Sequence, residues 1–406
     1  MNQNKSVKIR FKGFTEAWEQ RKLEDCAAII MGQSPKSENY TNDPKDHVLV
    51  QGNADLKNGQ VVPRVWTTEV TKVGKVGDII LSVRAPVGEV GKTAFDVVLG
   101  RGVAAIRGND FLLQTLQKFK ECKYWGRVSA GSTFDSITSE ILKSTVISMP
   151  TIEEQIKIGD FLSSVDNLIT LHQRKLNRFQ KIRTTFLQKM FPKNGETKPA
   201  IRLTGFNADW EQEKLQNFAV RITRKNIKKQ NNRPLTISAQ HGLVDQTVYF
   251  NNRVAAQDVS NYYLIKKGEF AYNRSTSKDA PVGAVRRLVD YEEGVLSTLY
   301  LVFSITDPQH VDPNYLSYFF ETTGWHSWIL ERAAEGARNH GLLNVSSQDF
   351  LSLPVMLPSS LEEQQKIGEF FQKIDDCIIL LERQADLLKQ IKSSLLLNMF
   401  PPSNAE

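Results

Sequence analysis

Apolar side chains recur at a seven-residue spacing in two long stretches of the chain, residues 152–191 and 361–400. The steps between them alternate between three and four, which places these side chains on one stripe of an α-helix. The residues expected on the two stripes are Leu162, Val165, Ile169, Leu176, Phe179, Phe186, Phe371, Ile374, Ile378, Leu381, Leu388 and Leu395. Each helix would be roughly 60 Å long, so we expect the stripes to bury each other in an antiparallel coiled coil.

Capping and stop signals mark the ends of both helices. Thr151 precedes the first helix and Ser360 the second, and acidic residues follow in the first turn of each, as helix N-termini favour. Pro192 and Pro401 end the two helices;.

Three positions on the stripes are not apolar, namely His172, Arg183 and Lys392. Long basic side chains can keep their apolar stems against a surface while the charge reaches water. We therefore expect these positions to be snorkelled or to lie at frayed ends, without a chemical role.

Two other regions, residues 23–149 and 215–357, mix short strand-like runs with helical stretches, and we name them the first and second heads. A strand-like run in each head ends at an arginine, Arg84 or Arg274. Helices are expected at residues 111–124 and 314–334. The fold class predicted is α+β, with two globular heads of mixed α and β structure joined by two long helices.

The chain is also an internal repeat. The segment at residues 10–20 returns at 202–212, and the Glu-Glu-Gln-x-Lys-Ile-Gly run returns after both heads. Each copy closes on Met-Phe-Pro, with Phe191 and Phe400 at the centre. A constant frame around two variable regions can present two different surfaces. The domains expected are residues 1–150, which contain the first head, 151–192 (long helix), 193–358, which contain the second head, and 359–406 (long helix).

Bulk composition narrows the class of protein. The 406 residues carry a formal net charge of +7, so a polyanion is a plausible partner. The three cysteines lie far apart, as free thiols in a reducing compartment would;. Neither a signal peptide nor an apolar run of membrane-spanning length is evident. We expect a cytoplasmic protein with no membrane contact.

Polar and basic residues of the heads are candidates for binding DNA. Lys and Arg neutralise phosphates, whereas Asn, Gln and Arg can form paired hydrogen bonds with base edges. Any single one could instead be an ordinary solvated surface residue. The candidates in the first head are Gln33, Lys36, Arg64, Arg84, Arg101, Ser132 and Thr133. Those in the second head are Arg224, Lys225, Lys228, Lys229, Asn273, Arg274, Ser275, Lys278, Arg338, Asn339 and His340.

No fragment of the chain predicts catalysis. The run at residues 88–93 resembles the tail of a phosphate-binding loop, but Pro86 occupies the place of its first glycine;. The tetrapeptide at residues 312–315 matches an amino-methyltransferase motif only loosely. The six histidines lack metal-ligand spacing;. We expect neither catalytic residues, nor a metal, nor a cofactor in this chain.

Taken together, the Gly-Phe…Trp-Glu segments, the doubled helix openings, the Met-Phe-Pro closures and the Ser-Ala-Gln-His-Gly-Leu-Val run at residues 238–244 resemble the specificity subunit of type I restriction-modification enzymes. The resemblance covers essentially the whole chain. It implies that each head is a target-recognition domain that reads one half of a split target in double-stranded DNA. The longer, more basic opening of the second head predicts an asymmetric target.

The resemblance also implies partners. The long helices would fix the spacing between half-sites and dock two modification subunits, which bind S-adenosylmethionine and methylate adenine. Restriction subunits, which use ATP and Mg, would join that core. Two other hypotheses remain open from the residues: an adaptor that binds only proteins through its coiled coil and heads, and a self-sufficient nuclease or methyltransferase.

Overall fold

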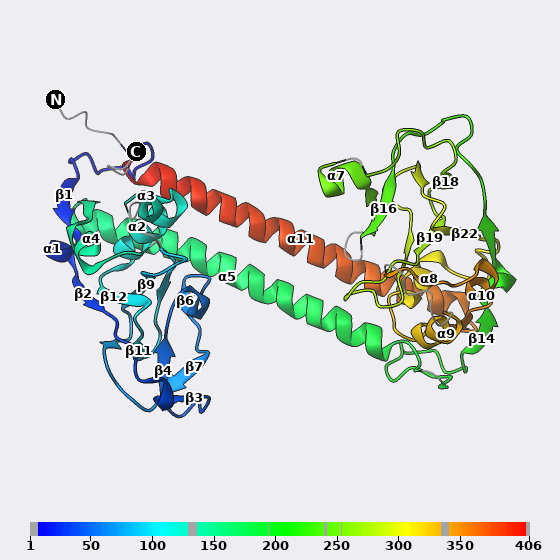
Figure 1. The fold of residues 1–406 in the computed structure, drawn as a ribbon, viewed down its shortest axis with the longest axis horizontal. Coiled ribbons are helices and arrows are strands. Elements are labelled where there is room, and N and C mark those ends of the chain that lie inside the picture. Colours follow the sequence, from blue (N-terminus) through cyan, green and yellow to red (C-terminus); the bar gives the residue numbers. More distant parts are fainter. Residues whose placement is uncertain are drawn as a thin grey trace. The chain divides into compact units, whose positions relative to one another are not determined.

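The computed structural model describes residues 7–128, 136–193, 195–238, 242–252, 254–333 and 341–402. The chain forms two compact units: unit 1 comprises Met1–Leu176 with Leu380–Glu406, and unit 2 comprises Asn177–Ile379. Each unit holds one head and one part of each long helix, α5 (Ile152–Lys189) and α11 (Leu361–Met399) (Figure 1). None of the helices in these described ranges is both long and apolar enough to cross a membrane.

The two long helices pack together in both units, as the stripes predicted. In unit 1, Leu162 near the start of α5 shares a buried cluster with Leu396 near the end of α11. In unit 2, Leu187 near the end of α5 shares one with Ile367 near the start of α11. Early residues of one helix thus meet late residues of the other, so the pairing is antiparallel in each unit. All twelve stripe residues are buried or half-buried.

The capping signals at the starts of the helices have the expected contacts. The Thr151 hydroxyl accepts a hydrogen bond from the Glu154 amide at 3.5 Å, and the Ser360 hydroxyl accepts one from the Glu363 amide at 3.4 Å. Each satisfies one of the amides that a helix N-terminus leaves unpaired.

The expectation for the basic positions on the stripes is wrong in two cases. Arg183 of α5 donates to Asp375 of α11, and Lys392 of α11 donates to Asp166 of α5. Their side chains are only 23% and 12% exposed, and both lie within the helices. They are therefore held in cross-helix ion pairs, because an acid on the opposite helix stands within reach.

The first head contains a six-stranded sheet, in the order β2-β12-β9-β10-β6-β5, and a five-stranded sheet, β3-β7-β4-β11-β8. Strands β1 and β13 pair separately. The strands are β1 (Glu19–Lys22), β2 (Ala28–Met31), β3 (Tyr40–Thr41), β4 (His47–Val50), β5 (Leu56–Lys57), β6 (Gln60–Val61), β7 (Val65–Thr67), β8 (Val73–Gly74), β9 (Ile79–Ser82), β10 (Val90–Lys92), β11 (Val97–Leu99), β12 (Val103–Arg107) and β13 (Val146–Met149). The helices are α1 (Leu23–Cys26), α2 (Asp110–Glu121), α3 (Tyr124–Val128) and α4 (Ser139–Ser144).

Burial of the central strand β9 explains its continuous apolar sequence. Ile79 and Leu81 pack in one cluster with Leu116 of α2, whereas Ile80 points to the other face and packs with Leu99 of the five-stranded sheet. Since successive side chains of a strand alternate between faces, a strand covered on both faces is apolar throughout. The first head is therefore two sheets and a layer of helices.

The second head repeats this plan with different detail. Its main sheet, β15-β22-β19-β20, has the order of β2-β12-β9-β10 in the first head. The strands are β14 (Glu211–Lys214), β15 (Ala219–Ile222), β16 (Leu235–Ser238), β17 (Gly242–Asp245), β18 (Tyr263–Lys266), β19 (Phe270–Asn273), β20 (Ala284–Arg287), β21 (Glu293–Leu296), β22 (Leu301–Ile305) and β23 (Pro354–Leu357). The helices are α6 (Leu215–Phe218), α7 (Gln246–Phe250), α8 (Pro313–Phe319), α9 (His326–Arg332) and α10 (Ser347–Leu351).

The single helix expected at residues 314–334 is two helices, α8 and α9. The interruption carries Thr322 and Gly324, whose own contacts compete with the helix: the Thr322 hydroxyl donates to Phe319 O at 2.7 Å and accepts from the Gly324 amide. Likewise α2 ends before Tyr124, where α3 begins.

The repeated Glu-Glu-Gln motif anchors the segment that precedes each head. Glu154 is fully buried and accepts two hydrogen bonds from the Arg10 guanidinium, at 2.6 and 2.7 Å. Glu363 accepts two from Arg202, both at 2.7 Å. These hydrogen bonds raise the pKa of both arginines;. The repeated arginine and glutamate thus form the same ion pair in both halves of the chain.

The glutamine of the motif joins a long helix to its head. Gln155 accepts from the Asn109 amide group at 2.9 Å and donates to Pro150 O. In unit 2, Gln364 accepts from the Asp312 backbone amide, also at 2.9 Å. Asn109 and Asp312 are the residues that cap α2 and α8, so in each unit the glutamine contacts the cap of the corresponding head helix, through a side-chain donor in one and a backbone donor in the other.

The glycine of the motif permits close approach at that point. A Cβ on Gly159 would lie 2.9 Å from Phe111 N in α2, and a Cβ on Gly368 would lie 2.9 Å from Asn314 Cβ in α8. Any other residue would push the head helix away from the long helix. The spacing of the motif therefore reflects three successive contacts that position each head.

Candidate nucleic-acid interface

Three candidates of the first head, Gln33, Arg84 and Arg101, gather around the turn between β11 and β12. The Gln33 amide donates to Leu99 O at 2.8 Å, and the Arg101 amide donates to the Ser34 hydroxyl at 3.0 Å. The Val83 amide, beside Arg84, donates to Gly102 O at 2.8 Å. The side chains of Gln33, Arg84 and Arg101 are exposed in this loop cluster, and those of Lys36 and Arg64 are exposed on neighbouring segments of the chain.

Close backbone contacts hold this loop cluster in one conformation. A Cβ on Gly102 would lie 2.0 Å from Gln51 O, and a Cβ on Gly32 would lie 2.0 Å from Gly100 O. Only glycine fits such approaches. Nearby, the buried Asp55 carboxylate accepts from the Gln51 amide at 2.7 Å and lies 3.7 Å from Arg64. Exposed polar side chains on a rigid loop frame are suited to recognition.

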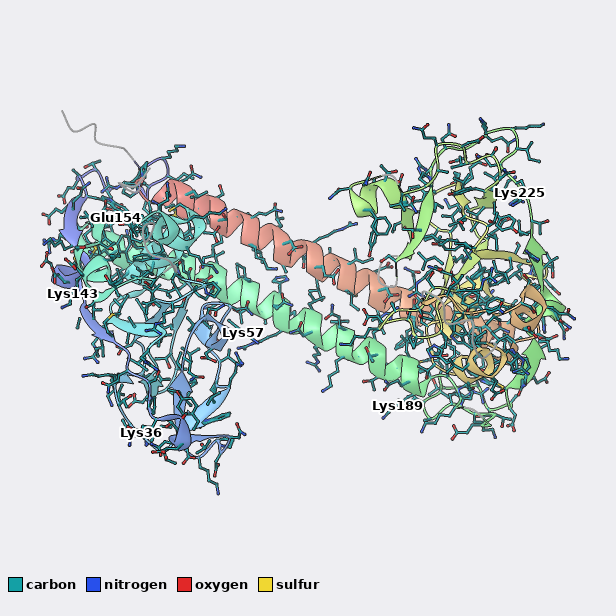
Figure 2. The ribbon with its side chains drawn as sticks, in the orientation of Figure 1. Lys36, Lys57, Lys143, Glu154, Lys189 and Lys225 are labelled. Atoms are coloured by element: carbon teal, nitrogen blue, oxygen red, sulfur yellow. The ribbon has the colours of Figure 1, made fainter. Side chains whose placement is uncertain are left out.

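One candidate in each head can be placed against a residue of the long helices. In Figure 2, Lys36 lies at the end of the first head that is remote from Glu154. Lys225 likewise lies at the end of the second head that is remote from Lys189, the last residue of α5. In each head, the segment that carries this candidate therefore lies away from the labelled long-helix residue.

In the second head, two basic candidates are tied into the structure. Both oxygens of the Glu269 carboxylate lie 2.7 Å from Arg224 Nη2. Lys225 donates to Asn261 O at 2.8 Å and its Nζ lies 4.1 Å from the centre of the Tyr263 ring. These contacts brace the loop that follows β15, leaving less of either cation free for a ligand.

Lys228 and Lys229 stand out from the same loop. Both side chains are exposed, and Lys229 adopts a φ of 52°. Its ammonium lies 3.6 Å from Asp258, a pair exposed on both sides and therefore weak. These two lysines are the most exposed of the basic candidates in this loop.

The arginines that end β9 and β19 differ in role. Arg84 is exposed, and its backbone bridges to Ser136. Arg274 instead donates from Nη2 to Leu299 O at 2.9 Å and from Nη1 to Val345 O at 3.1 Å. It holds neighbouring loops together. Arg84 bridges to Ser136 as Ser275 bridges to Leu342, so Arg274 occupies the place of Val83 and Ser275 that of Arg84.

The loop after β19 carries three further candidates. Asn273 Oδ1 accepts from the Ser275 amide at 3.0 Å, which shapes the start of the loop;. Ser275 and Lys278 are exposed. Five candidates lie outside the described residues, namely Ser132, Thr133, Arg338, Asn339 and His340.

The sequence-based search for functional residues missed those that position the heads. Arg10, Glu154, Arg202 and Glu363 were visible as repeats, but nothing in either copy indicated that the arginine binds the glutamate. Their recurrence at the same spacing in both halves was the available signal. As for chemistry, no group of three or more His, Cys, Asp or Glu side chains could hold a metal ion in the part of the chain that the structure describes.

Comparisons with known proteins agree with this architecture. The family model of the type I restriction modification DNA specificity domain matches twice, at residues 15–181 and 207–391. Residues of the chain are 35% identical over 175 positions to the putative type I restriction enzyme MjaX specificity subunit of Methanocaldococcus jannaschii, covering 41% of this chain and 40% of that protein. The MjaIX specificity subunit of the same organism is 24% identical over 188 positions, covering 43% and 44%.

These matches span less than half the length of either relative. The fold is similar over nearly the whole chain to the crystal structure of a type I restriction-modification S subunit from M. genitalium, with a TM-score of 0.64 and 14% identity. That similarity covers 98% of this chain and 100% of the other. With its two matched copies of the domain, the chain belongs to the family of type I restriction modification DNA specificity domains.

Proposed function

We propose that this chain is the DNA sequence-specificity subunit of a type I restriction-modification complex, with each head reading one half of an asymmetric, bipartite target. The observation that carries the proposal is the repetition of one strand order in two heads whose exposed loops differ. A shared scaffold gives both heads the same way of meeting a duplex, and different loop residues give them different bases to read.

The exposed cations supply the part of binding that does not depend on sequence. Lys36, Lys228, Lys229 and Lys278 neutralise phosphates, while Gln33, Arg84 and Arg101 can reach base edges with paired hydrogen bonds. Arg224 and Arg274 support the loops from behind. The exposed candidates of the first head and those of the second differ in the length and charge of their side chains. This difference favours recognition of two unlike half-sites.

The chain itself is non-catalytic in this proposal. Its helices dock two modification subunits, which bind S-adenosylmethionine and methylate adenine. Restriction subunits that use ATP and Mg join to form the endonuclease, and the assembly works on DNA in the cytoplasm. In this proposal, the methyl donor and ATP bind to the partner subunits.

A genome-wide map of adenine methylation tests the proposal, in cells with and without the gene and with the cognate modification subunit active. We expect a motif of two unlike short halves separated by a fixed gap, lost on deletion. An unchanged map, with methylation by the modification subunit demonstrated, would contradict it.

A further inference from the structure

A polar network interrupts the apolar helix interface in unit 1. Lys392 of α11 donates to Asp166 of α5 and to the side-chain oxygen of Gln117 in α2. The second oxygen of Asp166 accepts from Gln114, also in α2, at 3.0 Å. Gln114 is fully buried. One ion pair thus joins both long helices to a helix of the first head.

A corresponding network lies in unit 2. Arg183 of α5 donates to Asp375 of α11 and, at 2.6 Å, to Glu321 just beyond α8. Tyr318 of α8 donates to Asp375 at 2.9 Å. Again a cation and an acid on opposite long helices meet groups from one helical segment of a head.

The two networks occupy equivalent places in the repeat. Asp166 corresponds to Asp375, and Arg183 to Lys392, when the Glu-Glu-Gln motifs of the two halves are aligned. In each unit the acid and its cation therefore come from different halves of the chain. The head groups differ, being two glutamines in unit 1 and a carboxylate with a phenol in unit 2.

Such groups are a poor choice if stability alone is at stake. Burial lowers the pKa of Lys392, and the charge and hydrogen bond of Asp166 only partly offset it. Burial also opposes the charge of Arg183, although hydrogen bonds and the charges of Asp375 and Glu321 outweigh it and raise its pKa. Well-packed apolar residues are often as stabilising as a buried ion pair. Polar groups in a helix interface are best known for specifying register.

The sequence shows which contacts would be lost if α5 and α11 paired in a wrong register. Shifting the helices by one heptad brings Asp166 to the place beside Ala385 or Met399, depending on direction. The same shifts bring Asp375 beside Leu176 or Met190. All four of these side chains are buried and apolar, so each carboxylate would lose its cation in an apolar setting. The apolar stripes alone, repeating every seven residues, would tolerate the shift.

We propose that the Arg183–Asp375 and Lys392–Asp166 pairs are positioning residues that hold α5 and α11 in one register and thereby set the number of base pairs between the two half-sites. The second part rests on the function proposed above. One heptad is about 10 Å along a helix, which equals about three base pairs of B-DNA. The head residues bound to each pair seat the heads in that same register.

An apolar variant tests the proposal in the full chain, assembled with its modification subunit. It carries Asp166→Leu, Lys392→Met, Arg183→Met and Asp375→Leu. The matched control carries Asp386→Leu and Lys389→Met, an exposed pair on α11 at 3.0 Å. We expect the apolar variant to methylate sites with more than one gap length, differing by about three base pairs. The control keeps the single wild-type gap.

A second experiment measures the register of α5 against α11 without DNA. Spin labels at the exposed positions Arg174 of α5 and Gln384 of α11, with the native cysteines changed to serine, give one distance in the wild type. The apolar variant should add a second population shifted by about 10 Å along the helices. A single wild-type distance in the folded variant would overturn the register proposal.

A charge swap keeps the test decisive if the apolar variant fails to fold. Exchanging the acid and the cation within both pairs should preserve one register and one gap, provided that Glu321→Gln is included so that no carboxylate faces the acid placed at position 183. Lys392→Asp with Arg183→Asp, without the reciprocal changes, should not preserve the register. A scrambled register in the full swap would count against the proposal. If the wild type methylates no bipartite motif, the proposed function fails, while the label distances still decide the register.

Discussion

At the residue scale, composition alone does not distinguish a ligand-binding cation from a structural one. Arg224 and Lys228 lie four residues apart in one basic stretch, which sequence reading treated as equivalent. The structure pairs Arg224 with Glu269, 45 positions away, and leaves Lys228 exposed. Similarly, Arg84 and Arg274 each closely follow a strand, but only Arg274 donates to the carbonyls of Leu299 and Val345. These partners are distant in the chain, so no local sequence pattern predicts them.

The exposed lysines carry a prediction at this scale. Replacing Lys228 and Lys229 with alanine should weaken DNA binding by the assembled complex about equally for cognate and unrelated sequences. Both cations neutralise phosphates in the proposed interface, so the log–log slope of affinity against salt should fall by roughly 0.9 for each lost contact. Titration of labelled duplexes over a range of salt concentrations measures this slope.

Lys267→Ala is the matched control, because Lys267 is also exposed on the second head but pairs with Glu292 at 2.7 Å. Its slope should stay at the wild-type value. An unchanged slope in the Lys228 and Lys229 variant would remove these residues from the interface.

At the element scale, the sequence predicted the long helices well because their burial repeats regularly. An apolar stripe such as Leu162, Ile169 and Leu176 predicts a buried helix face without identifying the element that covers it, since any partner must bury the same side chains. The heads were predicted only as α+β. Strands such as β9 are buried on both faces, so their apolar runs do not show which sheet or helix lies on each side. The ion pairs of Arg183 and Lys392 were missed because their acids lie on the other helix.

Packing of α8 against α11 carries the prediction for elements. Gly368→Ala should destabilise unit 2 by about 1–3 kcal/mol, because overpacking a close contact forces backbone shifts. The new Cβ would lie 2.9 Å from Asn314 Cβ and 3.2 Å from Tyr315 N. Denaturant unfolding followed by hydrogen exchange in α8 measures the loss.

The control is Gly126→Ala in α3, where a Cβ would meet nothing within 4 Å. Alanine is the better helix former, so this variant should gain stability, by up to about 1 kcal/mol. Equal effects of the two substitutions would show that helix propensity, and not contact between α8 and α11, governs Gly368.

At the scale of the whole molecule, the end of the chain belongs to the unit that contains its beginning. Phe400 packs against Trp18 and Phe111, with ring centres 6.0 and 5.3 Å apart. Lys118 of α2 donates to Pro401 O at 3.0 Å, and the Ile9 amide donates to Asn398 O at 3.0 Å. The first Met-Phe-Pro closure does the same for the second head, where Phe191 packs against Trp210.

This connectivity predicts that the first Met-Phe-Pro closure, at Phe191, stabilises the second head. The second closure, at Phe400, should stabilise the first head. Phe400→Ala should therefore destabilise unit 1, by about 3–5 kcal/mol for a buried phenylalanine, although residue 400 lies far in sequence from the first head. Hydrogen exchange should accelerate in α2 and around Trp18, while α8 stays protected. Phe191→Ala, the matched variant, should reverse the pattern, exposing the surroundings of Trp210 and sparing α2. Faster exchange in the second head on loss of Phe400 would contradict this assignment, because Phe400 contributes to the core of unit 1 alone.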